Sequence, residues 1–265
     1  MNPPKFKISK VAIYAFLIVL LLLSVVPFYL VTVNGTHSSF DIVTKLNLLP
    51  GSSLAENYQT MQSHVNIAIP YTVITGYFGA FTAYGFAKYQ FRGKKVLYAI
   101  VLASMMIPTQ VTIIGFFQLN LKLKLLNSYW PFILRGFCNA TTVFFLRGII
   151  TQSIPDSMIE AARMEGCSEI RIFNKIVFPC IVPGVMTMSI FNYVACWNSY
   201  IEPLIIMTDK DMYTMPVMIS MIKGLYMSNY GAMYLAIAIS VIPIIVVFCF
   251  LSKYIINGLT VGSDK

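Results

Sequence analysis

The feature that most constrains this chain is a run of 23 residues without a charge, from Val11 to Val33. A helix needs about 20 mostly apolar residues to cross the hydrocarbon core of a bilayer, and this run has that length. The apolar core of a secretory signal peptide is shorter, about 7–15 residues, and a small-residue cleavage site follows it. We therefore interpret the run as an uncleaved first membrane span, with Lys5, Lys7 and Lys10 holding its start in the cytoplasm.

Five further apolar stretches have the length of a membrane span, at residues 65–87, 96–119, 128–150, 176–201 and 230–252. Charged residues make up only 11% of the chain, whereas a soluble domain has about 25%. Because this is too little charge to cover a soluble surface, the composition argues against a soluble enzyme and against a disordered protein. The sequence predicts one membrane domain over residues 1–265, an all-α polytopic protein with six transmembrane helices.

The basic residues indicate how the six spans are oriented. If the first span starts in the cytoplasm, thirteen Lys and Arg fall in inner segments and five in outer segments. This excess fits the positive-inside rule, although Lys122 and Lys124 run against it. We therefore expect both termini, the basic loop Lys88–Lys95 and the loop at residues 151–175 to lie in the cytoplasm. The net charge of +9 does not indicate a nucleic-acid partner, because the basic residues are scattered between apolar runs.

Few residues suggest chemistry. The five cysteines are an odd number without a CxxC pair, so we interpret them as small buried hydrophobes rather than as disulfides or metal ligands. No pair of carboxylates lies within the spans to relay protons, and no nucleophile constellation is apparent. We predict no catalytic residue, no metal site and no cofactor in this chain. Arg135, about two turns into the fourth span, is expected to extend toward the outer surface.

The connection between the fourth and fifth spans is unusually long and predicts two short helices. Pro155 suits a first helical turn, and Asp156 complements the positive end of the helix dipole. Gly166 predicts a left-handed stop, after which Ser168 caps a second helix that ends before Pro179. Spacing alone leaves two interpretations open: a helix that docks on another protein, or a plain connecting hairpin or interfacial helix.

Six residues of this connection have a recognisable spacing. They resemble the EAA signature of ABC-importer permeases: Glu160, Ala161, Ala162, Gly166, Ile176 and Pro179. Phe178 stands where that signature usually has Leu, and Glu165 where sugar permeases usually have Asp. Four other segments resemble motifs of the family in the same order: Lys88–Lys95, Trp197–Leu204, Tyr213–Pro216 and Gly258–Gly262. Together they resemble the MalG-type permease of carbohydrate importers over nearly the whole chain.

The resemblance implies an assembly in a bacterial plasma membrane, with the type I importer permease fold. Such a permease pairs with a MalF-like permease, two ABC ATPase subunits dock beneath the pair, and an extracellular solute-binding protein delivers the carbohydrate. The loop would be a cytoplasmic coupling helix seated on the ATPase, with these contact residues: Glu160, Ala161, Ala162, Arg163 and Gly166. ATP and Mg would be bound by the ATPase partners, because this chain has no Walker A sequence. The outer connection Glu202–Asn229 would contact the solute-binding protein.

A polar stripe on the fifth span contains the first candidates for a substrate path. Ser189, Asn192, Cys196 and Ser199 recur at spacings of three, four and three, which places them on one helix face. Their polar groups could replace water on sugar hydroxyls, and aromatic rings could cover the apolar side of a sugar. Three further candidates lie at the outer end of the same helix: Trp197, Asn198 and Tyr200.

Alternatives to a substrate path stay open for both polar stripes. A stripe of small and polar residues also mediates helix packing, and we favour packing for the similar stripe on the second span, formed by Thr72, Thr75, Gly79 and Thr82. Interfacial aromatic residues form belts without binding a ligand. Thr109 and Gln110 follow Pro108 in a kinked third span, where freed carbonyl groups could line a cavity.

Two classes of function follow. The first is a permease subunit that imports a carbohydrate, with an oligosaccharide expected, and this is the function that the resemblance implies. The second is an autonomous secondary transporter or an integral-membrane enzyme, which would need carboxylates, histidines or a metal site within the spans. The sequence does not identify the sugar.

The predicted orientation can be tested by labelling single cysteines from outside intact cells, in a variant without the five native cysteines. Cysteines at positions 94 and 169 should stay unlabelled, because both loops are expected in the cytoplasm. A cysteine at position 45, in the first outer segment, should react and serves as the positive control. Strong labelling at position 94 or 169 would contradict the orientation.

Overall fold

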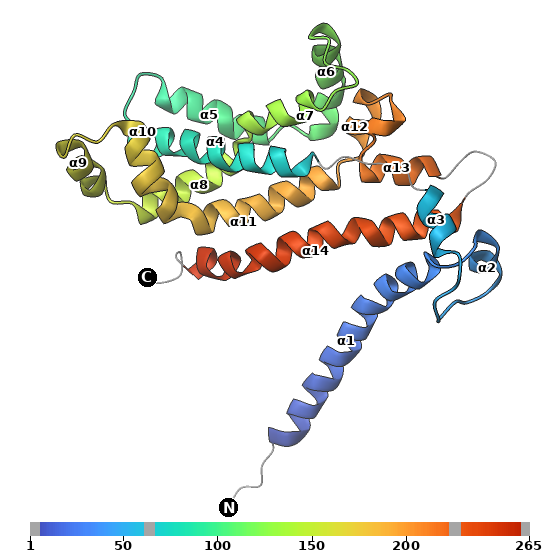
Figure 1. Ribbon diagram of the computed structural model, residues 1–265. Coiled ribbons are helices and arrows are strands. Elements are labelled where there is room, and N and C mark those ends of the chain that lie inside the picture. Colours follow the sequence, from blue (N-terminus) through green and yellow to red (C-terminus); the bar gives the residue numbers. More distant parts are fainter. Residues whose placement is uncertain (1–5, 61–66, 223–228, 261–265) are drawn as a thin grey trace, which may run out of the picture. The chain divides into compact units, whose positions relative to one another are not determined.

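The computed structural model describes residues 6–60, 67–222 and 229–260 (Figure 1). Within these ranges the chain forms helices and no strands. The α-helices run in this order: α1 (Phe6–Asn34), α2 (Ser39–Thr44), α3 (Leu54–Thr60), α4 (Ala68–Lys88), α5 (Lys94–Met105), α6 (Thr109–Lys122), α7 (Trp130–Arg135), α8 (Ala140–Ser153), α9 (Asp156–Met164), α10 (Glu169–Ile172), α11 (Phe178–Trp197), α12 (Ile201–Ile206), α13 (Met215–Ile222) and α14 (Tyr230–Thr260). Short 3-10 segments at Gly136–Cys138 and Lys210–Met212 and a π segment at Phe173–Val177 complete the elements. Part of the predicted outer connection, residues 223–228, and the end of the terminal motif lie outside the described residues.

The chain divides into two compact units, one formed by Met1–Gln62 with Met218–Ile242 and the other by Ser63–Val217 with Pro243–Lys265. In the first unit, the segment after α1 folds against the start of α14. Asn57 is buried and donates hydrogen bonds of 2.9 Å to the carbonyl oxygens of Gly35 and His37. A side chain at Gly231 would lie within 2.6 Å of the Asn57 amide, so the backbone approaches closely here.

The core of the second unit is formed by α4, α8 and α11, which all contact one another (Figure 1). Small residues allow this approach. A Cβ atom added at Gly79 of α4 would lie 2.7 Å from Cγ2 of Thr142 on α8, and one added at Gly184 of α11 would lie 2.3 Å from Cδ1 of Ile149. Thr75 and Gly79 are buried in this packing, so the packing interpretation is correct for these two members of the stripe on the second span.

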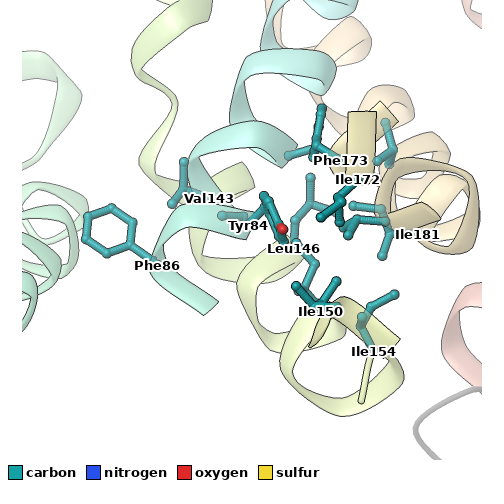
Figure 2. Packing of buried hydrophobic residues seen from close by; sticks show 14 of the residues in the cluster. Tyr84, Phe86, Val143, Leu146, Ile150, Ile154, Ile172, Phe173 and Ile181 are labelled. Atoms are coloured by element: carbon teal, nitrogen blue, oxygen red, sulfur yellow. The ribbon is translucent and has the colours of Figure 1, made fainter. Parts of the chain in front are cut away.

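Apolar side chains fill the end of this core that lies beside α9 and α10. Figure 2 shows Tyr84 of α4, Leu146 and Ile150 of α8, and Phe173 and Ile181 around the same space. All five are at most 2% exposed. The packed apolar layer fixes the ends of α4, α8 and α11 relative to one another. The loop that joins α8 to α11 therefore begins and ends on helices that are held in place.

Four helical segments in the described residues are long and apolar enough to cross a membrane: Lys10–Asn34, Trp130–Ser153, Glu169–Trp197 and Tyr230–Tyr254. They correspond to the predicted first, fourth, fifth and sixth spans. The second predicted span contains α4, which is 21 residues long but carries several Thr, Tyr and Gly residues that lower its hydropathy. The count of six spans and the orientation stay predictions.

The predicted third span, residues 96–119, is not one continuous helix. It is divided into α5 and α6, whose axes are bent by 106° at a short break. Pro108 is the residue before α6. Proline lacks a backbone N–H and disfavours helical backbone at the residue before it, so the chain breaks here more sharply than the expected kink.

The prediction that the second loop helix ends before Pro179 is wrong. Helical structure continues from Glu169 through the π segment into α11 and ends at Trp197. In the π segment the Phe178 N–H bonds to the carbonyl oxygen of Phe173, five residues earlier. Pro179 then occupies the first turn of α11, where a missing N–H is tolerated. Ser168 precedes α10 as predicted, but its side chain makes no capping hydrogen bond.

Substitution of Gly79 by Ala should destabilise the core by about 1–3 kcal/mol, as overpacking typically does. The new methyl group would meet Thr142, which is fully buried and cannot rotate freely because its Oγ1 accepts a hydrogen bond from Asn192. Thermal unfolding of the detergent-solubilised protein would show a lower Tm. Gly85→Ala, on the same helix with no atom within 4 Å of the new Cβ, is the matched control. Equal Tm values for the two variants would contradict this packing.

Candidate functional site

The candidate residues lie at opposite ends of the three-helix core of the second unit (Figure 1). The loop helix α9 lies beside the C-terminal end of α4. A pocket lies at the other end, where α4 begins and α11 ends.

The loop helix α9 ends at the predicted glycine. Gly166 has a φ of 77°, in the left-handed region that glycine adopts without strain, so the predicted stop is confirmed. The N–H of Cys167 bonds to the carbonyl of Ala162 at 3.0 Å, and the N–H of Gly166 to that of Arg163 at 2.9 Å. This pair of bonds is a Schellman motif, and it turns the chain sharply from α9 toward α10.

Lys88 anchors the beginning of α9 to the end of α4. Its ammonium group bonds to the carbonyl oxygen of Ile154 and to the Asp156 carboxylate, the latter at 2.7 Å. The Lys88 side chain is only 7% exposed, so its charge depends on these two acceptors. The hydrogen bond from Lys88 lowers the pKa of Asp156 below its ordinary value.

Glu169 anchors the end of α9. Its carboxylate accepts a hydrogen bond from Arg163 at 2.7 Å and others from the hydroxyl groups of Tyr84 and Tyr89. The Arg163 guanidinium also lies over the Tyr89 ring, 5.5 Å from its centroid. The bond to Glu169 raises the pKa of Arg163 above its ordinary value. Arg163 thus stabilises the loop itself, in addition to any contact with a partner.

The inner face of α9 is apolar and packs on the core. Ile159 is 2% exposed and Ala162 is 6% exposed, and both belong to the apolar cluster that contains Ile172 and Phe173. Of the two predicted contact alanines, only Ala161 therefore lies on the exposed face. Glu160 is exposed as well, and the same face continues over other exposed residues: Met158, Met164 and Glu165.

Sequence reasoning did not identify the residues that hold the loop in place. Lys88, Tyr84 and Tyr89 were assigned only to a span and a basic loop, and Glu169 had no role. A partial signal was present, since a lysine at the end of an apolar span and an acidic residue in the first turn of a helix both seek partners. The identity of these partners, 68 to 85 residues away in the chain, was not readable from spacing.

The pocket at the other end of the core has a volume of about 310 Å³. Arg135 and Glu202 form an ion pair at its wall, and Tyr71 and Phe132 add aromatic surface. Arg135 is therefore paired with a carboxylate, and its expected extension toward the outer surface stays a prediction. Of the two residues expected to line a cavity after Pro108, Thr109 lines the pocket and Gln110 is not among its lining residues.

The predicted substrate-path residues are divided between the pocket and the packed core. Cys196 and Ser199 line the pocket, and Asn198 and Tyr200 are exposed near it. Three others are buried in helix contacts: Ser189, Asn192 and Trp197. The amide of Asn192 donates to Thr142 Oγ1 at 2.9 Å, and Ser189 donates to the carbonyl of Val185 on its own helix. The Trp197 ring stacks on Tyr193, with 6.0 Å between the ring centroids.

No arrangement for metal binding is found in the described ranges. They contain no group of three His, Cys, Asp or Glu residues able to hold a metal ion. The five cysteines are unpaired, and Cys138, Cys180 and Cys249 are exposed. The interpretation of the cysteines as buried hydrophobes is therefore wrong for these three within this chain. The absence of cofactors from this chain stays a prediction.

The chain was compared with known proteins. Residues 75–261 match the family described as binding-protein-dependent transport system inner membrane component. The arabinooligosaccharides transport system permease protein AraQ of Bacillus subtilis (strain 168) is 30% identical, over 100% of this chain and 99% of that protein. The melibiose/raffinose/stachyose import permease protein MelC of the same organism is 26% identical, over 91% of each chain.

A solved structure has the same fold. It is a crystal structure of a bacterial ABC transporter involved in the import of the acidic polysaccharide alginate, and one of its chains matches with a TM-score of 0.72. The match covers 96% of this chain and 99% of that chain, at 20% sequence identity. The arrangement of helices is therefore the one found in an ABC importer permease.

Substitution of Ile159 by Ala should release α9 from the core. Removal of a buried isoleucine side chain costs about 2–5 kcal/mol where the cavity cannot collapse, so amide hydrogen exchange over residues 156–166 should accelerate at least tenfold. Exchange in α8 should change little. Met164→Ala removes a side chain that is 88% exposed on the same helix and should leave the exchange rates unchanged. Equal rates in the two variants would show that α9 is not held by its apolar face.

Proposed function

The chain belongs to the family of binding-protein-dependent transport system inner membrane components, and we propose that it is a permease subunit of an ATP-driven carbohydrate importer. In this proposal it pairs with a second, MalF-like permease, and two ABC ATPase subunits supply the energy. An extracellular solute-binding protein delivers the substrate. The chain itself catalyses no reaction.

The observation that carries the proposal is the attachment of α9. The helix is held at its start by Lys88 and at its end by Glu169, and its inner face is packed on the core. A merely connecting helix needs no such anchors. Because α9 is fixed at three places, a force applied to its exposed face is transmitted to α4, α8 and α11 instead of being absorbed by the loop. This is the mechanical property that a coupling helix requires.

The exposed face of α9 offers the chemistry for docking on an ATPase. Ala161 leaves room for a side chain of the partner, and Glu160 supplies a charge that a basic partner residue can pair. Arg163 is already bonded to Glu169, so we assign it to positioning the helix rather than to direct contact. Gly166 turns the chain back toward the core. Ala162 is assigned to packing within the loop.

We assign the pocket at the opposite end to the substrate path. Its volume of about 310 Å³ is at the lower end of the range for ligand pockets, so it would hold part of an oligosaccharide rather than a whole one. Ser199, Arg135 and Glu202 offer hydrogen-bonding groups for sugar hydroxyls. Tyr71 and Phe132 offer rings for the apolar face of a sugar. Carbohydrate as the substrate class is supported by the relatives, two of which are named for arabinooligosaccharide and for raffinose-type sugars.

The alternative, an autonomous secondary transporter or integral-membrane enzyme, makes a different prediction about energy. Uptake into proteoliposomes by this chain with its partners should require ATP hydrolysis inside and stop when ATP is replaced by a non-hydrolysable analogue. Uptake driven by an ion gradient without ATP would favour the alternative.

Ala161→Trp and Gly166→Pro should each abolish carbohydrate uptake while leaving the protein in the membrane. Tryptophan would fill the docking face, and proline cannot adopt the positive φ of Gly166 because its ring fixes φ near about −65°. ATPase co-purification and uptake should be measured together. Ala99→Trp, the same substitution at an exposed alanine of α5, is the control and should retain uptake. Normal ATPase binding and transport in both loop variants would contradict the assignment.

Ser199→Trp should reduce uptake about tenfold or more by filling the pocket, with ATPase binding unchanged. The contrasting variant is Ser157→Trp, at an exposed position of α9 outside the pocket, which should lose ATPase binding and uptake together. Loss of ATPase binding by Ser199→Trp, or unchanged uptake, would remove this pocket from the substrate path.

A further inference from the structure

A second pocket lies beside the loop between α4 and α5, at the same end of the core as α9. Its volume is about 550 Å³, and its polar lining consists of Gln90, Lys94, Lys95, Tyr98 and Arg147. Neither the coupling role of α9 nor the substrate path uses these residues. Three of them are cations, and none of the residues that line the pocket is acidic. The lining of the pocket therefore carries an excess of positive charge.

The cations are held in position by contacts that leave their charge available. Lys94 donates a hydrogen bond of 2.7 Å to the carbonyl oxygen of Tyr89, which is a neutral acceptor. The Arg147 guanidinium lies over the Tyr98 ring, 4.2 Å from its centroid, and its Nε atom is buried without a hydrogen-bond acceptor. The carboxylate near Lys94, that of Asp156, is already paired with Lys88, so the pocket keeps an excess of positive charge for an anion.

The start of α5 adds to this charge. Gly93 precedes the helix with a φ of 84°, no side chain caps the first turn, and that turn contains no acidic residue. Nothing lies within 4 Å of the position that a Gly93 side chain would occupy, so the approach to the backbone is open. The positive end of the helix dipole therefore faces the same space as Lys94 and Lys95.

The surface that continues from the pocket along α5 is apolar. Val96, Leu97 and Ile100 are 65%, 48% and 58% exposed. A polar, positively charged pocket at the end of an exposed apolar helix has the two parts of a phospholipid site: a place for the headgroup phosphate and a surface for an acyl chain. A free phosphate would use only the first part.

We propose that this pocket binds the phosphate of an anionic phospholipid, with Lys94, Lys95 and Arg147 around the headgroup and an acyl chain along α5. The chemistry shared with a soluble ligand is that of a phosphate anion, and the apolar flank makes the lipid the favoured source. Because Lys94 is bonded to Tyr89, which also holds Glu169, the bound lipid would lie directly behind the anchor of α9.

The test uses the assembled importer, purified with a mixture of phosphatidylglycerol and phosphatidylcholine that have the same acyl chains. Native mass spectrometry then counts the lipids that stay bound. Each cation near an anionic headgroup contributes about 1 kcal/mol, which is about fivefold in affinity. Lys94→Gln/Lys95→Gln should therefore reduce the preference for phosphatidylglycerol about 25-fold, while it leaves the Arg147–Tyr98 contact in place.

The matched control is Lys122→Gln/Lys124→Gln, which removes the same charge from two exposed lysines outside the pocket and should keep the preference. Equal lipid preference in the two double variants would overturn the proposal.

Calorimetric titration of inorganic phosphate into the delipidated importer separates the two sources of phosphate, a lipid headgroup and a soluble anion. No measurable binding at millimolar phosphate supports the lipid, whereas binding that the Lys94/Lys95 variant loses would show that a soluble phosphate is the ligand and overturn the lipid assignment. Neither measurement depends on transport, so failure here leaves the importer function untouched.

Discussion

The close approach of α4 to α8 and α11 is the constraint on which the rest of the second unit depends. In a bilayer the lipid tails are as apolar as the side chains, so helices associate through tight packing and hydrogen bonds rather than through the hydrophobic effect. Gly79 and Gly184 allow that packing, because any side chain there would overlap a neighbour. The Asn192–Thr142 hydrogen bond, between buried groups on α11 and α8, then holds the helices in one arrangement.

The packed core connects the two candidate functional regions. α4 contributes Tyr71 to the pocket near its first turn and Lys88 to the anchor of α9 at its last residue. A helix of 21 residues is about 31 Å long, so one rigid element reaches from the pocket to the loop helix α9. Its ends cannot move independently while the core remains packed. A tilt imposed at α9 would therefore change the pocket, which is the geometric requirement for energy coupling.

The sequence predicted local features well. The helical class follows from apolar runs, and the left-handed backbone at Gly166 follows from a residue type that few alternatives can replace at a helix end. The family was readable from ordered motifs. By contrast, the partners of Lys88 and Asn192 lie 68 and 50 residues away, and periodicity holds no information on such pairs.

Two helix ends also differ from the sequence-based prediction for physical reasons. The sequence favours a helix end before Pro179, but the π segment before this residue supplies a bonding pattern that tolerates the missing N–H. Pro108 was taken as a kink, and the chain instead breaks into two helices. Whether a proline bends, breaks or begins a helix is decided by the packing around it, which the sequence does not display. Packing also decides which residues of the polar stripe on α11 are buried between helices and which line the pocket.

The unequal burial of the helices has a consequence for how the protein is made. No residue in the apolar window of the first span is buried inside the chain, whereas 56% of the corresponding window is buried in Glu169–Trp197. The apolar window of the first span makes no burying contact within its own compact unit, so this span can enter the lipid before most of the chain has been synthesised. The helix that ends at Trp197 has no such independence, since the amide of Asn192 finds its partner on α8. Translation must pass this point before the central bundle can close, and until then the amide of Asn192 must be satisfied by water or by the insertion machinery.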